Sequence, residues 1–185
     1  MAGLREPRRR RAEGVPALTY TLRTVGPDDA HQLGTAHVAI WKATYPGIVN
    51  QAKLDALTPR DRIARWVRII EAIGDQEARG IHTRCAVDDS SGHIIGFATG
   101  GTPRDDDAPR PTELWSLNVL PDHHGSGIAA RLMNEVTGHR IGAMFLWVAT
   151  RNARAIAFYR KHGLELDGGT RFDPDWECHE SRMIG

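Results

Sequence analysis

The feature that most constrains the fold is an unbroken apolar run from Ala143 to Ala149. A strand with one solvated face alternates between apolar and polar residues, and this run shows no such alternation. It is therefore typical of a strand that is covered on both faces, as strands are in sheets that carry helices on either side. A chain that contains such a strand needs helices to cover it.

The rest of the chain supplies both strand-like and helix-like patterns. Besides the run at 143–149, the predicted strands cover residues 19–25, 83–87, 93–99, 112–120, 164–172 and 177–184. The predicted helices cover residues 28–45, 58–74, 128–136 and 152–162. This order of elements predicts a mixed α/β fold.

With 185 residues, of which 41% are hydrophobic and 25% charged, the chain has the size and composition of one globular domain. A chain of this length buries about two thirds of the surface of its unfolded form, so it needs no disulfide or metal for stability. Cys85 and Cys178 form no CxxC pair and indicate reduced thiols. No apolar run approaches the roughly 20 residues of a membrane span, so we expect a cytoplasmic protein.

Residues 1–18 differ from the rest of the chain in charge. They hold five Arg and two Glu, a local charge of +3, whereas the whole chain has a formal charge of +1. We therefore expect a disordered Arg-rich leader at 1–18 and a single folded domain at 19–185. The alternative role of the leader is contact with nucleic acid, but the slightly acidic remainder offers no basic face in the sequence. A twin-Arg export signal is excluded because no apolar stretch follows the arginines.

Gly125 and Gly127 lie between the strand at 112–120 and the helix that begins near Ile128. Glycine accepts the backbone angles of an anion-binding turn, and the N-terminus of the helix adds a favourable dipole. For an isolated glycine pair, a purely structural turn is the commoner explanation. The sequence lacks the distal acid of a dinucleotide fingerprint, the Gly-Lys-Ser/Thr of a P-loop, and the Gly-x-Ser-x-Gly of a hydrolase. It also lacks any metal-ligand spacing.

Three segments together carry a stronger signal, namely residues 113–121, 124–129 and 152–163. In residue types, order and spacing they resemble the GNAT family of acyl-CoA-dependent N-acetyltransferases. The stretch 37–47 is similar to the first helix and turn of many bacterial members. The resemblance implies a GNAT-like α/β fold, with a central, mostly antiparallel sheet of about seven strands. Two of these strands are expected to be parallel and splayed, and about four helices to flank the sheet.

The resemblance also implies acetyl-CoA as the acyl donor, and no metal. It places the pyrophosphate on backbone amides of the glycine turn and the pantetheine arm between the strands at 114–120 and 143–149. His124 stands where the family pattern has Arg or Gln. This difference puts one side-chain contact with the phosphates in question, whereas the contacts from the backbone amides do not depend on it. For Asn152 a plain N-cap is the alternative role. The cofactor-binding residues implied are Leu117, Asn118, Val119, His124, Gly125, Ser126, Gly127, Ile128, Ala129, Ala130, Asn152 and Phe158.

The reaction implied is transfer of the acetyl group to a primary amine by direct attack in a ternary complex. Tyr159 matches the tyrosine that the family uses as general acid, and a phenol with a pKa near 10 stays protonated at neutral pH. The alternative role of Tyr159 is that of an aromatic residue packed in the core. Glu113 matches a position where several members carry a general-base glutamate, and its alternative is a solvated strand start. Trp41 and Tyr45 are expected at the acceptor site.

Two further hypotheses stay open. A domain of this fold can hold acyl-CoA as a sensor or scaffold without turnover, although Tyr159 and Glu113 favour an enzyme. The expected partners are acetyl-CoA and an amine acceptor of unidentified kind, with no membrane and no favoured nucleic acid. The sequence does not decide between a monomer and a homodimer.

Overall fold

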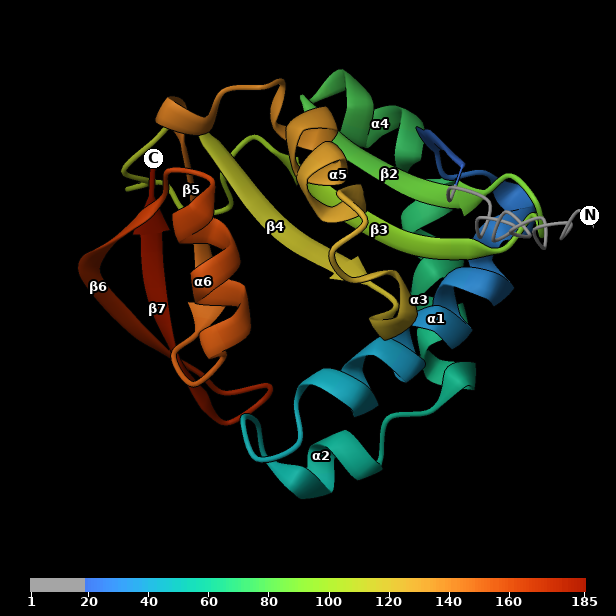
Figure 1. Ribbon diagram of the computed structural model, residues 1–185, viewed down its shortest axis with the longest axis horizontal. Coiled ribbons are helices and arrows are strands. Elements are labelled where there is room, and N and C mark those ends of the chain that lie inside the picture. The colour runs from blue at the N-terminus through green and yellow to red at the C-terminus, as the bar shows by residue number, and fades with distance from the viewer. Residues whose placement is uncertain (1–18) are drawn as a thin grey trace, which may run out of the picture.

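The computed structural model describes residues 19–185, and its centre is one seven-stranded sheet (Figure 1). The strand order is β1-β2-β3-β4-β5-β7-β6, and every neighbouring pair is antiparallel except β4 with β5. The predicted mixed fold with one parallel pair is therefore confirmed. The strands are β1 Tyr20–Thr24, β2 Ile81–Asp88, β3 Ile94–Gly101, β4 Thr112–Val119, β5 Met144–Ala149, β6 Glu165–Asp173 and β7 Cys178–Ile184.

Helices cover both faces of this sheet (Figure 1). They are α1 Ala30–Thr44, α2 Gln51–Asp55, α3 Pro59–Glu71, α4 Ile73–Ala78, α5 Ile128–Thr137 and α6 Ala153–Lys161. Helices α1 and α3 lie on one face of the sheet, and α5 and α6 lie on the opposite face, α5 against β2, β3 and β4 and α6 beside β5 and β7 (Figure 1). Three short 3-10 turns, η1 Pro27–Asp29, η2 Pro121–His123 and η3 Ile141–Ala143, complete the chain.

Each helical layer has its own apolar cluster. Helix α5 buries Ile128 and Leu132 against the sheet, because residues three and four apart share one helical face. On the opposite face, Leu33 of α1 and Trp66 of α3 contact Phe97 of β3 in a second cluster. Gly34 lets α1 and α3 approach each other closely, since a Cβ at this position would lie 2.4 Å from Cγ1 of Ile63.

The parallel strands β4 and β5 are paired over three residues only. The partners are Thr112 with Met144, Glu113 with Phe145, and Leu114 with Leu146. Beyond Leu114 the two strands separate, while β4 stays paired with β3 and β5 stays paired with β7. This confirms the expected splayed parallel pair and leaves two strand edges facing each other inside the molecule.

The prediction of one helix at 58–74 is wrong only at its C-terminal end. Helix α3 ends at Glu71, and Gly74 lies inside the following helix α4 instead of ending the first one. Helix α4 buries no residue. It is held by Glu77, whose carboxylate lies 2.8 Å from Nδ1 of His82 and also accepts from Arg84. These contacts come from β2, so no local pattern announces them.

The expected leader at 1–18 lies outside the described residues. Within residues 19–185, no helix has both the length and the apolar character that a membrane crossing requires. In the same part of the chain, no three His, Cys, Asp or Glu side chains come together as ligands for a metal ion.

Candidate active site

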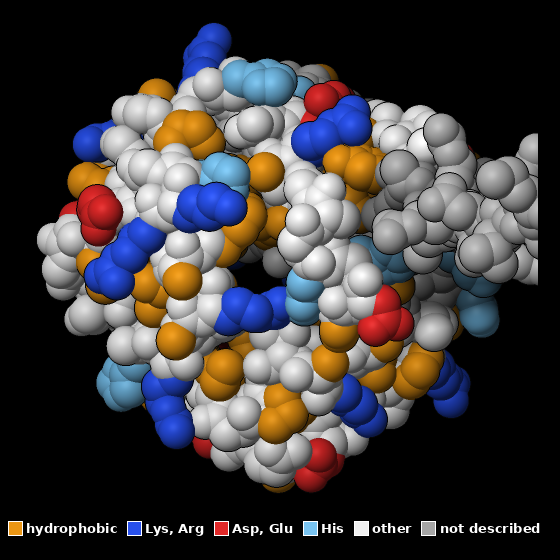
Figure 2. All heavy atoms as spheres, in the orientation of Figure 1, with side chains coloured by type: hydrophobic (Ala, Val, Ile, Leu, Met, Phe, Trp, Pro, Cys, Tyr) orange, Lys and Arg blue, Asp and Glu red, His pale blue; other side chains and the backbone are white. Residues whose placement is uncertain are grey.

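A cavity of about 780 Å³ opens where β4 and β5 separate. Figure 2 shows a hollow in this face of the molecule, with Lys or Arg and His side chains at its rim. Of the residues singled out in the sequence, the cavity is lined by Trp41, Tyr45, Leu117, Asn118, Val119, His124, Gly125, Gly127, Ala129, Ala130, Asn152, Phe158 and Tyr159. Glu113, Ser126 and Ile128 do not line it.

The glycine turn, residues 124–127, connects η2 to the start of α5. Gly125 and Gly127 have φ angles of +80° and +87°, in the left-handed region that disfavours other residues. A Cβ at Gly127 would meet nothing within 4 Å, so the space beside it is open. The first amides of α5 have no intrahelical acceptor and are free to bind an anion there.

Two predicted members of the turn contribute no side chain to the cavity. The hydroxyl of Ser126 donates to the carbonyl of His123 at 2.6 Å. The Ile128 side chain is fully buried in the core beneath α5. Any contact that Ile128 makes with a bound anion therefore comes from its backbone amide.

His124 is engaged by protein groups on both ring nitrogens. Nε2 lies 3.1 Å from the carbonyl oxygen of Val119, and Nη1 of Arg154 lies 2.6 Å from Nδ1. Burial and the charge of Arg154 lower the pKa of His124. A neutral ring that donates from Nε2 to Val119 leaves Nδ1 to accept from Arg154. Arg154 of α6 thus brings a guanidinium beside the glycine turn, where the family pattern has its own Arg or Gln.

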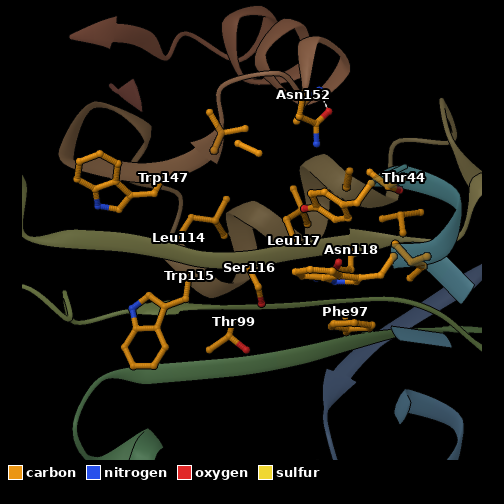
Figure 3. Close-up of a pocket in the computed structure, with 18 of the residues that line it drawn as sticks. Thr44, Phe97, Thr99, Leu114, Trp115, Ser116, Leu117, Asn118, Trp147 and Asn152 are labelled. Carbon is orange, nitrogen blue, oxygen red and sulfur yellow. Dashed lines mark hydrogen bonds between the residues drawn. The ribbon is translucent and has the colours of Figure 1, made fainter. Parts of the chain in front are cut away.

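Asn152 performs the capping role that the sequence offered as an alternative. Its Oδ1 accepts from the backbone N–H of Ala155 at 3.1 Å and so caps α6. Its Nδ2 points toward the cavity from the α6 side (Figure 3). The two roles are compatible, because the cap uses the oxygen and leaves the amide nitrogen as a donor.

Tyr159 lies on the cavity side of α6 and is buried, with its ring 5.2 Å from that of Phe158. Burial raises the pKa of the Tyr159 phenol above its ordinary value, and the nearby Tyr45 adds to this rise. The hydroxyl therefore carries its proton throughout the neutral range and can donate it to a base inside the cavity.

The acetyltransferase (GNAT) family matches residues 40–164 of this chain. The chain belongs to this family. A Mycobacterium tuberculosis protein named a probable N-acetyltransferase is 28% identical over 151 residues, which cover 80% of this chain and 82% of that one.

Solved structures of acetyltransferases resemble this GNAT domain in fold. The PaiA N-acetyltransferase of Thermoplasma acidophilum, solved in complex with coenzyme A, superposes with a TM-score of 0.68 at 20% identity. The match covers 91% of this chain and all of that one. The YncA protein of Salmonella typhimurium, solved with acetyl-CoA, gives a TM-score of 0.59 at 19% identity and covers 89% and 92% of the two chains.

Glu113 of this GNAT domain is not solvated, as a strand start often is, but fully buried. The backbone N–H and Nε of Arg104 donate to its carboxylate at 2.9 Å and 3.0 Å, and Nη2 of Arg104 completes the ion pair. Since Glu113 also lies outside the cavity lining, the geometry speaks against it as the general base. Glu180 of β7 does line the cavity, and Nε of Arg171 donates to it at 2.6 Å.

Three aromatic rings form one wall on the acceptor side. The Trp41 ring lies 4.4 Å from that of Tyr45 and 4.2 Å from that of Trp176. Trp176 belongs to the β6–β7 turn, which is fixed because its carbonyl accepts from the backbone N–H of Asn50 at 2.9 Å. Burial raises the pKa of Tyr45 to about 12, with a contribution from Glu180. The two predicted acceptor-site residues therefore lie together, joined by Trp176.

The same cavity continues between α1 and α3 on one side and β3 and β4 on the other. We call this part the acceptor compartment; it is lined by His37, Arg62, Arg65, Trp66, Thr83, Phe97 and Thr99. Along its floor Ser116 lies opposite Thr99, and Asn118 lies opposite Phe97 (Figure 3). The hydroxyls of Thr83 and Thr99 are 3.0 Å apart.

The sequence did not identify His37, Arg62 or Arg154 as site residues. Position 124 holds His where the family pattern has Arg or Gln. This departure was a signal to look for a replacement cation, and Arg154 lies within the segment 152–163 that carried the resemblance. His37 begins the stretch 37–47 and Arg62 belongs to no motif, and because they come from different helices their meeting depends on how α1 and α3 pack.

Proposed function

We propose that this enzyme transfers an acetyl group from acetyl-CoA to a primary amine by direct attack in a ternary complex. The observation that carries the proposal is the continuity of the cavity, which runs from the glycine turn past Tyr159 into the acceptor compartment. Two substrates that enter from the two ends can therefore meet at one point, as direct transfer requires.

For acetyl-CoA, the proposal uses the glycine turn and the first amides of α5 for the pyrophosphate. Arg154 supplies a positive charge beside the turn, held in place by His124. The pantetheine arm lies against the unpaired edge of β4 near Leu117, Asn118 and Val119, with Asn152 and Phe158 on the α6 side. This arrangement supports CoA binding largely through backbone groups.

In the transfer step, the amine lone pair attacks the thioester carbonyl carbon, the C–N bond forms and the C–S bond breaks. The sulfur leaves as a thiolate and takes the proton of the Tyr159 hydroxyl. A backbone N–H between Leu117 and Val119 can donate to the developing oxyanion. The amine loses one proton in the same sequence, and this proton needs an acceptor in the cavity.

We assign that proton to Glu180 in place of Glu113. Glu180 lines the cavity, and its charge contributes to the raised pKa of Tyr45, which in turn affects Tyr159. The proton passes from the amine to this carboxylate directly or through one water. Arg171 fixes the carboxylate at 2.6 Å and so acts as a positioning residue.

Cys85 and Cys178 are both free and buried, which fits a reducing compartment, so we place the enzyme in the cytoplasm. The direct test of the function is an acceptor screen that follows release of the CoA thiol, with calorimetric titration of acetyl-CoA on the same preparation. We expect stoichiometric acetyl-CoA binding and turnover with at least one class of amine. Tight binding without turnover on any amine would favour the sensor or scaffold hypothesis instead.

A further inference from the structure

The acceptor compartment contains buried hydrogen-bond donors that lack acceptors. Within residues 19–185, both ring nitrogens of His37, Nε of Arg62 and Nε1 of Trp66 have no hydrogen-bond partner. A neutral imidazole provides one donor and one acceptor, whereas the guanidinium and the indole only donate. Among these unpartnered atoms donors therefore outnumber acceptors, and buried polar groups left unpaired are costly.

The charges that face this compartment are also unbalanced. Arg104 is paired with Glu113, and Arg171 is paired with Glu180. In the described part of the chain, neither Arg62 nor Arg65 has a carboxylate within 4.0 Å. The nearest acid that affects Arg62 is Asp61, whose Oδ2 accepts from the Thr58 hydroxyl at 2.6 Å.

The pKa of His37 reflects the same excess of positive charge. Its pKa is lowered to about 3 by burial first, and then by the charges of Arg62 and Arg65. No carboxylate offsets these two guanidinium groups at the ring. An anion that enters the compartment is therefore attracted by the positive charges of half-buried Arg62 and exposed Arg65.

We propose that the amine acceptor also carries a carboxylate, which binds in the acceptor compartment on Arg62 with Arg65 behind it. This inference rests on the proposed function and specifies its substrate class as a small amino acid-like molecule. A carboxylate only accepts hydrogen bonds, so it matches the donors of His37, Arg62 and Trp66. Phe97 and Trp66 provide apolar walls for the part of the molecule between the two charged groups.

Other acceptor classes fit this end of the cavity less well. A polyamine would place a second positive charge against Arg62 and Arg65. A protein N-terminus continues as a neutral peptide chain and offers no carboxylate beside its amine. The unpartnered atoms have almost no accessible surface, so the Arg62 side chain has to turn when a ligand reaches them.

The test uses the twenty free amino acids, each paired with its own carboxamide, together with spermidine and a peptide with a free N-terminus. The measured quantity is kcat/KM from CoA thiol release at saturating acetyl-CoA. For the best pair we expect the carboxylate to react at least 10-fold faster than the carboxamide. We expect Arg62→Gln to remove this preference by lowering kcat/KM for the amino acid and leaving kcat/KM for its carboxamide unchanged. We expect Arg62→Glu to shift the preference from the amino acid toward spermidine.

The matched control is Arg68→Gln, six residues further along α3, where Arg68 is exposed and does not line the cavity. It should keep the wild-type preference, and Arg65→Gln should give a partial loss. Thermal melting of each variant shows whether the fold is intact. Calorimetric titration of the CoA-loaded protein with the same amino acids provides a readout that needs no turnover.

The outcomes separate the two proposals. Equal or better use of carboxamides, peptides or spermidine overturns the carboxylate inference and leaves the acetyltransferase function standing. The inference also fails when no free amino acid either binds or reacts. A protein that neither binds acetyl-CoA nor releases CoA with any amine contradicts the proposed function itself.

Discussion

The two ends of the cavity are built in different ways. At the cofactor end, the glycine turn and the first turn of α5 present backbone amides, and polar side chains such as Arg154 and Asn152 add to them. At the acceptor end, recognition depends on side chains such as His37 and Arg62, which come from separate helices. The first end can persist while its sequence changes around the glycines. We expect the ligand preference of the second end to change with a single substitution.

The largest effect is expected from Gly127→Val at the cofactor end. A β-branched residue strains the left-handed turn and fills the open space beside it, so acetyl-CoA binding should weaken by at least roughly 100-fold. Calorimetry measures the affinity. The matched control is Gly92→Val, since Gly92 has φ +70°, an equally open Cβ position and no contact with the cavity. Unchanged affinity in the Gly127 variant would remove the pyrophosphate from this turn.

Tyr159→Phe acts where the two ends meet. The substitution removes the proton and keeps the ring, so turnover should fall by roughly 100-fold while acetyl-CoA affinity holds. The Tyr20→Phe variant, on the edge strand β1, should behave as wild type. If Tyr159→Phe weakens acetyl-CoA binding and leaves saturated turnover intact, the hydroxyl is a cofactor contact and not the acid.

The pair Glu180→Gln and Glu113→Gln compares a cavity carboxylate with a buried one. Glu180→Gln should lower turnover by roughly 10-fold or more with little change in melting temperature. Glu113→Gln should instead lower the free energy of unfolding by about 1–3 kcal/mol, because it disrupts the buried contact with Arg104. Loss of turnover in a fully stable Glu113→Gln protein would restore Glu113 as the base.

Arg154→Gln measures how much the cofactor end depends on a side chain. We expect acetyl-CoA affinity to fall by about 5-fold to 10-fold at low salt, with a smaller difference at high salt because counterions screen exposed charges. Arg151→Gln is the control, since Arg151 is also exposed but does not line the cavity. Equal affinity of both variants at low salt would show that the amides bind the phosphates alone.

The smallest effect concerns stability at the acceptor end. Because the folded pKa of His37 is about 3 and the ordinary value is 6.5, the unfolded chain binds a proton that the folded chain does not. The free energy of unfolding gains nothing more from this group above pH 6.5. It falls by about 1.4 kcal/mol per pH unit as the pH drops from 6.5 toward 3.

Urea unfolding at pH 7.5 and 5.5 checks this dependence. Wild-type protein should lose about 1 kcal/mol more than His37→Leu between these values. His31→Leu, on the exposed side of the same helix, should lose as much as wild type. An equal loss in all three proteins would show that His37 takes up its proton at the same pH in the folded and the unfolded state.

Most of the residues that the sequence singled out for the cofactor line one cavity, because they lie in short local segments. Two glycines at a strand-to-helix junction determine the backbone angles of the turn, and Asn152 and Tyr159 lie in one contiguous segment. The positions of the strands along the chain followed from the hydrophobic pattern, including the buried run that became β5.

The parts that the sequence did not predict depend on distant contacts. The Glu113 carboxylate is bound by Arg104, which belongs to a polar loop with no regular pattern. The burial of Glu113 could therefore not be predicted from the sequence. Helix α4 continues through Gly74 because Glu77 reaches β2. The acceptor compartment depends on the close approach of α1 and α3 at Gly34, which places Arg62 beside His37.

The short contact between β4 and β5 sets the shape of what can enter. Strand edges on a protein surface attract other chains, but here two such edges face each other inside the fold, beyond Leu114 and Leu146. Only a slender, flexible molecule with amides spaced as in a peptide can lie between them and satisfy their N–H and C=O groups. The gap between β4 and β5 therefore favours linear ligands. A ligand bound in it also stabilises the folded protein, because it contacts both parts of the sheet.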